Sequence, residues 1–397
     1  MGRRPAQRVL ASGHLGRGVL NDRDSRKQLD AAGAGVMTTG RTVGEPLPLR
    51  PAEAHALDVA RNLPGSRIVC TTVGRGQAAR TLAHERPDAA VACWFLDLFQ
   101  HDLATESWAA LPRGLQGVCV ADMPAGPFDL AVVPLAKDGE AELSRDILQS
   151  ALVNLAIGGH LVTAIDNPRD NWLREQLAET GEKVRVRPAE VSGPKAKPGT
   201  VAYVVEKTRE PAKVRDFSCE IVFRDRDRLL TAFTRPGVFA HRRIDPAARH
   251  LLGAVDIAAD ARVLDIGCGS GSVALGIASR DESVRVHAID SSARAVECTR
   301  RGAAANGLSN LTVALEAAGR VPDPGTYDLV LANPPYYSDF RIAERFVEAA
   351  RAALAAGGTL LIVTKQPSWY VENLPASWRD VARAEVNTNH LIEAVRP

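Results

Sequence analysis

From about residue 244 to the end of the chain, short apolar runs alternate with amphipathic stretches. The apolar runs ARVLDI (261–266), VRVHAI (284–289), LTVAL (311–315), YDLVLA (327–332) and TLLIVT (359–364) predict buried strands. Asp245 followed by Pro246 predicts a helix start before the first strand. Further helices are expected over 271–280 and 292–305. This alternation predicts an α/β fold with a doubly wound parallel sheet and helices on both faces.

Another helix is expected after residue 340, because the apolar positions there repeat at helical spacing. Its predicted face carries Ile342, Phe346, Val347, Ala350 and Leu354, and Gly357-Gly358 is expected to end it.

The N-terminal half repeats the same plan. SRIVCTTVGRGQAARTLA aligns with ARVLDIGCGSGSVALGIA, so that Gly74 and Gly76 match Gly269 and Gly271. Between Phe128 and Gly159 the matching residues keep a constant offset of 199. The sequence therefore predicts a duplication with two tandem Rossmann-like domains. Cys70 and Pro134 replace Asp265 and Asn333, which predicts that the N-terminal copy is degenerate.

The expected domain limits follow from this comparison. Residues 1–36 show little periodicity and are interpreted as a disordered tail, with a basic RNA-tethering arm as the alternative. Residues 37–212 are expected to form the degenerate domain that supports substrate binding. Residues 213–397 are expected to form the catalytic domain.

Composition limits the classes of function. The chain has 397 residues, 45% apolar and 24% charged, and its net charge of +2 excludes a strongly basic nucleic-acid binder, so RNA contacts must come from local patches. The six cysteines form no CxxC pair, which argues against zinc and favours a reducing cytoplasm. No apolar run is long enough for a membrane span, and we expect no membrane partner.

The segment VLDIGCGSG places three glycines, Gly267, Gly269 and Gly271, between a strand and a helix. Glycines there allow a tight turn and a close approach of the backbone to a ligand. Asp290 ends the next strand, where a carboxylate can bind the two hydroxyls of a ribose. Asp265 disfavours a pyrophosphate and favours a cationic amino-acid end, although it can also cap its own loop amides. The implied cofactor is S-adenosyl-L-methionine, and the predicted cofactor-binding residues are Asp265, Gly267, Gly269, Gly271, Asp290, Ser291 and Glu316.

The segment LANPPYY follows the fourth strand of the second copy, which flanks the crevice of a 3-2-1-4-5 sheet. The Asn333 oxygen and the Pro334 carbonyl can accept the N–H groups of an exocyclic amine and stabilise its developing positive charge. Pro335 stiffens the turn, and Tyr336 offers a flat face for stacking. Asn333, Pro334, Pro335 and Tyr336 are therefore the predicted catalytic residues.

With these motifs in place, the chain resembles the class I S-adenosylmethionine-dependent methyltransferases. It is similar in particular to the tandem-domain guanine-N2 methyltransferases of small-subunit ribosomal RNA, in VLDIGCGSG, HAIDSS, LANPPYY and the stretch TRPGVFAHRRIDPAARHLL. The resemblance implies that the last stretch covers the active site, with Phe239 and Asp245 lining the pocket. The sequence departs from the family pattern at Ala240, at Arg242-Arg243 and at Tyr337.

The expected function is methylation of guanine N2 in ribosomal RNA, with the small subunit or its assembly intermediate as partner, no metal, and a monomeric chain. Phe239, Arg242, Arg243 and Tyr337 are the predicted substrate-binding residues, and Lys195 and Lys197 are further candidates for RNA contact. The same motifs also serve adenine-N6 and protein glutamine-N5 transfer. A non-catalytic RNA-binding or ribosome-assembly protein is the alternative from a different class.

Overall fold

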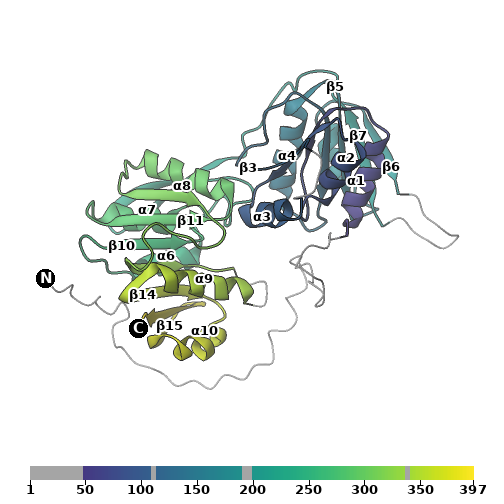
Figure 1. The fold of residues 1–397 in the computed structure, drawn as a ribbon. Helices are drawn as coiled ribbons and strands as arrows, with labels where there is room; N and C mark the ends of the chain where they lie inside the picture. The colour runs from purple at the N-terminus through teal and green to yellow at the C-terminus, as the bar shows by residue number, and fades with distance from the viewer. Residues whose placement is uncertain (1–47, 109–112, 190–198, 336–339) are drawn as a thin grey trace. The chain divides into compact units, whose positions relative to one another are not determined.

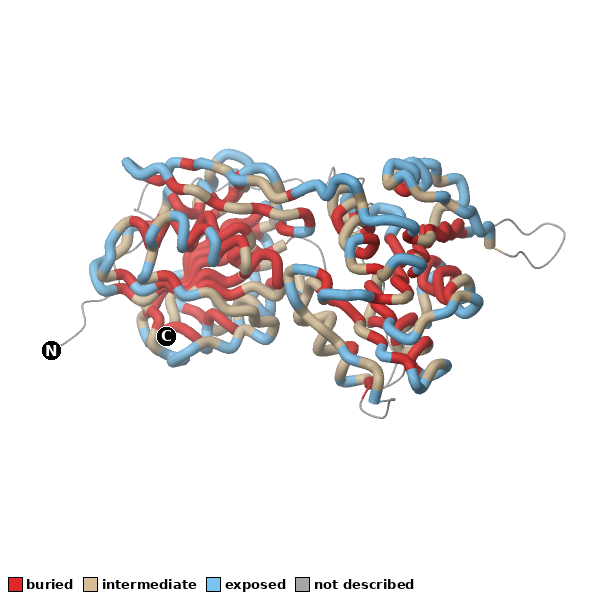
Figure 2. The backbone as a smooth tube through the Cα atoms, turned by 90° about the horizontal axis from the view of Figure 1, so that it is seen from above, coloured by how far each residue is buried: buried red, intermediate tan, exposed pale blue. Residues whose placement is uncertain are grey.

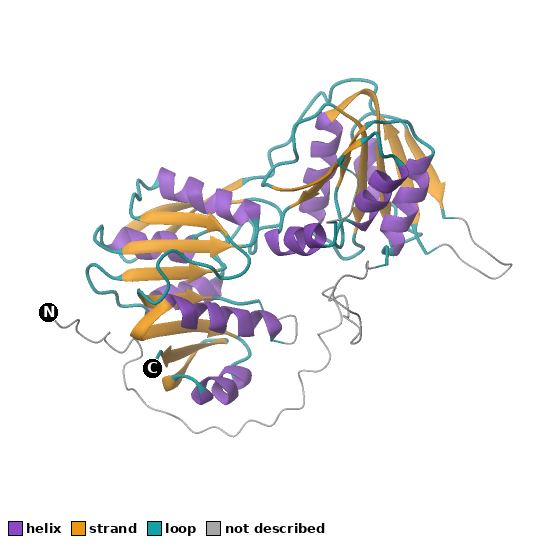
Figure 3. Cartoon of the chain, in the orientation of Figure 1, coloured by secondary structure: helices purple, strands orange, loops and turns teal. Residues whose placement is uncertain are grey.

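The computed structural model describes residues 48–108, 113–189, 199–335 and 340–397. The expected tail (1–36), Lys195 and Lys197 lie outside these ranges. The chain divides into two compact units, with the boundary between Phe217 and Ser218, and each has its own sheet with helices on both faces (Figures 1 and 3). No helix in the described ranges combines the length and apolar character that a membrane span requires.

The sheet of the N-terminal unit has the strand order β3-β2-β1-β4-β5-β7-β6. Strands β1 to β5 run parallel, whereas β7 pairs antiparallel with both β5 and β6. The elements are α1 (Pro51–Arg61), β1 (Arg67–Cys70), α2 (Gln77–Glu85), β2 (Ala90–Phe95), α3 (Leu98–Glu106), β3 (Leu115–Cys119), β4 (Phe128–Leu135), α4 (Ala141–Asn154), β5 (Leu155–Ile165), α5 (Trp172–Ala178), β6 (Val184–Pro188) and β7 (Val201–Glu206).

The sheet of the C-terminal unit has the equivalent order β12-β11-β10-β13-β14-β16-β15. A two-stranded hairpin of β8 and β9 precedes it. The elements are β8 (Cys219–Asp225), β9 (Arg228–Thr234), α6 (Pro246–Ala254), β10 (Arg262–Ile266), α7 (Ser272–Arg280), β11 (Arg285–Asp290), α8 (Ala293–Ala305), β12 (Leu311–Leu315), β13 (Tyr327–Ala332), α9 (Arg341–Ala353), β14 (Leu354–Thr364), α10 (Ser368–Asn373), a 3-10 turn (Leu374–Ala376), β15 (Arg379–Val386) and β16 (Asn389–Val395).

The two units share pairing details that go beyond strand order. Phe128 pairs with Leu155, and a register shift then brings Leu130 opposite His160. In the second unit Tyr327 pairs with Leu354, and the same shift brings Leu329 opposite Thr359. The offset of 199 holds for every one of these pairs, and it confirms two tandem Rossmann-like folds.

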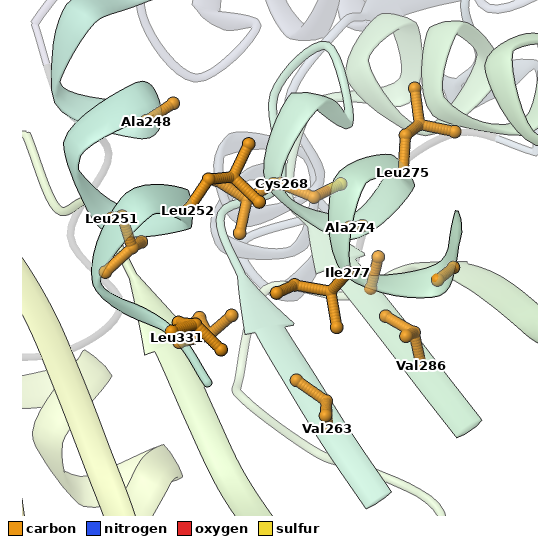
Figure 4. Packing of buried hydrophobic residues seen from close by; sticks show 14 of the residues in the cluster. Ala248, Leu251, Leu252, Val263, Cys268, Ala274, Leu275, Ile277, Val286 and Leu331 are labelled. Atoms are coloured by element: carbon orange, nitrogen blue, oxygen red, sulfur yellow. The ribbon is translucent and has the colours of Figure 1, made fainter. Parts of the chain in front are cut away.

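The core of the C-terminal unit lies on both faces of its sheet, as alternation along parallel strands requires. Val263 and Leu331 pack under α6 and α7, together with Leu251, Leu252 and Ile277 (Figure 4). Leu264, Ile266 and Val330 point to the opposite face, under α9 and α10. Buried residues therefore follow the central strands through each unit (Figure 2).

One expected boundary is wrong. The helix predicted to reach Gly357-Gly358 ends at Ala353, and Leu354 is already extended, with φ −64° and ψ 145°. The glycines lie inside β14, where the Gly357 amide donates to the Arg396 carbonyl at 2.9 Å. Leu354 pairs with Tyr327 of β13, and this non-local pairing, which helical spacing could not reveal, extends β14 toward the helix.

Candidate active site

The ends of four neighbouring strands bring the predicted site residues into one row. Ile266 of β10 pairs with Ile289 of β11 on one side and with Ala332 of β13 on the other. The next residues are therefore Gly267, Asp290 and Asn333, side by side at adjacent strand spacings of about 4.8 Å. Asp290 in turn pairs with Leu315 of β12, so Glu316 continues the row. This is the crevice at the carboxyl edge where open α/β sheets bind ligands.

The glycine turn requires glycine at each of its three positions. Gly267, Gly269 and Gly271 have φ values of 73°, 55° and 78°, which other residues rarely adopt. A Cβ at Gly267 would lie 3.0 Å from the Phe346 ring, and one at Gly271 would lie 2.7 Å from Thr299. A Cβ at Gly269 would meet nothing within 4 Å. The turn is therefore packed against Phe346 and Thr299 at Gly267 and Gly271, and it is open at Gly269, where a ligand can approach the backbone.

Asp265 lies beneath this turn and is 3% exposed. Its Oδ2 accepts the Ala274 amide of the first turn of α7 at 3.1 Å, so the expected capping role is present. Burial raises the pKa of Asp265 to about 7, and the nearby Asp290 adds to this rise. A cationic group placed at the turn would favour the ionised form of this carboxylate.

Asp290 organises the loop that joins β11 to α8. Its two oxygens accept the amides of Gly269 and Ser292, each at 2.8 Å. Ser292 is the N-cap of α8, and Ser291 lies between the two, half-buried. The carboxylate thus ties the glycine turn to the start of α8, at the position where a ribose-binding acid is expected.

Glu316 continues from β12, and its amide donates to the Asp290 carbonyl at 2.9 Å. Its side chain accepts the Ala318 amide at 2.6 Å and pairs with Arg320 at 3.3 Å. The Glu316 carboxylate is therefore held at the rim of the row, next to Asp290.

Asn333 is oriented by a carboxylate. Its Nδ2 donates to Oδ2 of Asp245 at 2.6 Å. The other Asp245 oxygen accepts the Ala247 amide at 3.2 Å as the N-cap of α6. Because an ionised carboxylate only accepts, the Asn333 amide must turn its NH2 group to Asp245 and its oxygen away from it. The predicted acceptor oxygen is thereby aimed by its neighbour.

Pro334 is buried and Pro335 half-buried directly after Asn333, so the turn is rigid and partly packed. Tyr336 and Tyr337 lie outside the described residues.

The three remaining substrate candidates lie between β9 and α6. Phe239 is 67% exposed, and Arg242 and Arg243 are also exposed. Ala240 and Arg242 adopt left-handed φ values of 58° and 66°, which are costly for residues other than glycine. The chain there is strained, and it carries an aromatic ring and two cations at the surface.

The N-terminal copy has lost each member of the row. Phe95 ends β2 as Asp290 ends β11, and Thr72 stands at the position of Gly267. The Thr72 hydroxyl accepts the amides of Gly74 and Gly76, both at 2.9 Å. The Phe95 ring lies 6.1 Å from the Trp108 ring, and a Cβ at Gly76 would meet Trp108 at 2.8 Å. An apolar ring therefore stands where the second copy has the Asp290 carboxylate, and a hydroxyl side chain stands where it has Gly267.

Sequence reasoning missed the residues that hold the segment 235–243. Arg235, Arg294 and Glu297 make its contacts with α8, and the β8–β9 hairpin that leads into it was also missed. The alternation of CEIVFRD and RLLTAFT around a two-residue turn was the available signal. Within the described residues no three His, Cys, Asp or Glu side chains are grouped to hold a metal.

Comparison with known proteins gives a consistent result for this half of the chain. Residues 230–392 match the model of the methyltransferase small domain. Ribosomal RNA small subunit methyltransferase C of Chromohalobacter salexigens is 36% identical over 152 residues, covering 35% of this chain and 44% of the relative. The protein of that name from Klebsiella pneumoniae is 36% identical over 138 residues, covering 34% and 40% respectively. The matches thus span less than half the length of these curated relatives.

A solved structure extends the likeness in fold to both units. The 16S rRNA N2 methyltransferase of T. thermophilus, in complex with AdoMet and guanosine, superposes with a TM-score of 0.72 at 21% identity. The match covers 88% of this chain and 92% of that one, which confirms the tandem fold. The match to the methyltransferase small domain, residues 230–392, therefore falls on the part of the chain that carries the row of strand-end residues.

Proposed function

We propose that this protein transfers a methyl group from S-adenosyl-L-methionine to the exocyclic N2 of a guanine in small-subunit ribosomal RNA. The observation that carries this proposal is the row of Glu316, Asp290, Gly267 and Asn333, in which Asp245 orients the Asn333 amide. The names of the curated relatives and the guanosine bound by the T. thermophilus enzyme support the choice of substrate.

The residues have distinct tasks in this proposal. When bound, S-adenosylmethionine supplies an electrophilic methyl group on a sulfonium, which is already a good leaving group. Asp290 holds the ribose hydroxyls, Asp265 and the glycine turn hold the amino-acid end, and Ser291 and Glu316 complete this wall. The Asn333 oxygen and the Pro334 carbonyl accept the N–H groups of the target amine, which keeps its lone pair available. Tyr336 and Tyr337 are proposed to stack on the base.

We assign residues 213–397 to the catalytic domain and residues 37–212 to a supporting domain that grips the RNA. Phe239, Arg242 and Arg243 are proposed substrate contacts because they are exposed beside the site. The reaction needs no metal, and we propose that the protein acts as a monomer in the cytoplasm, where ribosomal subunits are assembled.

A labelling experiment tests the proposal. Purified protein, tritiated S-adenosylmethionine and ribosomal RNA or 30S particles from a deletion strain are combined, and the modified nucleosides are mapped by mass spectrometry. N2-methylguanosine is expected at one site with the wild-type protein. Asn333→Ala should lower kcat by roughly 10²–10³ while the affinity for the cofactor stays near wild type.

Other products would identify the alternatives. Detection of N6-methyladenosine would identify adenine as the target in place of guanine, and detection of methylated glutamine would identify a protein substrate. Cofactor-independent RNA binding without any transfer would favour the assembly-protein alternative.

A further inference from the structure

The segment 235–245 connects β9 to α6, and one side of it is fastened to α8. The Arg235 guanidinium pairs with Glu297 at 2.5 Å. Nη1 of Arg294 donates to the Pro236 carbonyl at 2.8 Å. Between these polar contacts Val238 is buried against Ala295 and Cys298 of the same helix.

The other side of the segment folds back on β9 and then reaches the catalytic amide. The Thr234 hydroxyl accepts the Arg242 amide at 3.2 Å and lies 2.9 Å from Nδ1 of His241. Three residues later Asp245 binds Asn333. The segment therefore joins α8, whose start is tied to Asp290, with the amide that faces the substrate.

The Arg294 side chain is 1% exposed, which is unusual for a guanidinium. Taking such a charge out of water is costly, so an apolar residue would serve packing alone at least as well. The degenerate copy forms the equivalent helix without this arginine. Counted from the helix N-caps Asp97 and Ser292, Phe99 stands at the position of Arg294.

We propose that Arg294 and the Arg235–Glu297 ion pair are positioning residues of the methyl-transfer site. They hold the strained segment 235–245 against α8. This attachment fixes Phe239 over the substrate and Asp245 against Asn333. It also keeps both residues in a fixed position relative to Asp290, the carboxylate that is proposed to bind the ribose. The inference deepens the proposed function and rests on it. Because misplacement of reacting groups by about 1 Å can cost roughly 10²-fold in rate, loosening this attachment should act on kcat.

The test compares matched variants of the full chain. Arg294→Met removes the donors and leaves a shorter, unbranched apolar side chain, whereas Arg294→Lys keeps the positive charge and one donating nitrogen. Glu297→Gln removes the charge at a half-buried position, where folding should tolerate it. Arg300→Gln is the control, because Arg300 lies on the same helix but binds the Val313 carbonyl instead.

Single-turnover transfer at saturating cofactor should fall about 10- to 100-fold in Arg294→Met and Glu297→Gln. Arg294→Lys should recover most of the rate, and Arg300→Gln should match wild type. The Kd for S-adenosylmethionine should stay within about 3-fold in all four variants, because the hydrogen bonds of Asp265, Gly269 and Asp290 given above involve none of the three substituted residues. A lower melting temperature with an unchanged rate per folded molecule would show that these residues only stabilise the fold, and would overturn the proposal.

Hydrogen exchange separates this inference from the proposed function. The amides of Val238 and Arg243 are bonded within the segment, and the Arg242 amide is bonded to the Thr234 hydroxyl of β9. All three should exchange faster in Arg294→Met and Glu297→Gln than in wild type, without any ligand. If the wild-type protein failed to methylate ribosomal RNA, the proposed function would be refuted. Hydrogen exchange would still show whether these residues hold the segment 235–245 against α8. Unchanged rates of amide exchange over residues 236–243 in both variants would refute this attachment.

Discussion

Replacing Asp245 with asparagine should separate the orientation of the Asn333 amide, the proposed catalytic group, from the stability of the fold. Asp245 has two tasks, capping α6 through the Ala247 amide and accepting from Asn333. Asparagine is about as good an N-cap as aspartate, so Asp245→Asn should change the free energy of unfolding by no more than about 0.5 kcal/mol. To keep the cap, its carbonyl oxygen must face Ala247, and its NH2 group then faces Asn333.

The reversed hydrogen bond between residues 245 and 333 would change which group of Asn333 faces the substrate. Asn333 would then bond best by turning its own oxygen toward residue 245, which leaves its NH2 group facing the target amine. One preorganised acceptor would be lost and a donor would replace it. Loss of one such electrostatic partner costs about 2.7–4 kcal/mol, so kcat should fall roughly 10²- to 10³-fold. Asp245→Ala should instead lose the cap as well, at about 1 kcal/mol of stability.

The assay is single-turnover methyl transfer to ribosomal RNA under saturating cofactor, together with thermal unfolding of the same preparations. Asn333→Ala is the matched comparison, and it should be close to Asp245→Asn in rate, while the double variant should be no slower than either single one. A wild-type rate for Asp245→Asn, with chemistry shown to be rate-limiting, would refute the orienting role of the carboxylate.

Three further outcomes follow from the site. Asp290→Ala should weaken cofactor binding by about 1–3 kcal/mol in calorimetry, because the ribose hydroxyls of the ligand lose a charged partner. An unchanged Kd would show that Asp290 does not bind the ribose. Burial raises the pKa of Asp265 to about 7, so between about pH 4 and 7 the ligand-free fold keeps a proton that the unfolded chain has lost. Stability should therefore fall as pH rises through this range, and Asp265→Asn, which can still accept from Ala274, should flatten the dependence of the melting temperature on pH; an equally steep profile would contradict this. Titration should give one cofactor per chain, because the N-terminal copy has Phe95 and Thr72 at the positions of Asp290 and Gly267, and a second site would disprove that argument.

Much of the central architecture could be predicted because a buried parallel strand appears in the sequence as a short run of apolar residues. The run YDLVLA coincides with β13, since a strand covered on both faces needs continuous apolar residues, and LTVAL coincides with β12, the partly exposed strand at the sheet edge. The glycine turn was predictable for a similar reason, because its φ values admit few residues other than glycine. The antiparallel strands β6, β7, β15 and β16 were not identified, and the end of α9 was misplaced because the start of β14 depends on the pairing of Leu354 with Tyr327 of β13.

The sequence by itself determined the repeated plan, the position of the site residues at the strand ends, and the loss of those residues from the first copy. These properties are local, because spacing, apolar periodicity and residue type each act within a few positions. Tertiary structure alone decided which side chains meet across long separations. Asp245 and Asn333, 88 positions apart, become hydrogen-bonded partners, and Arg235 meets Glu297 across 62 positions. Such contacts depend on how whole helices and strands pack, and no short stretch of sequence encodes that arrangement.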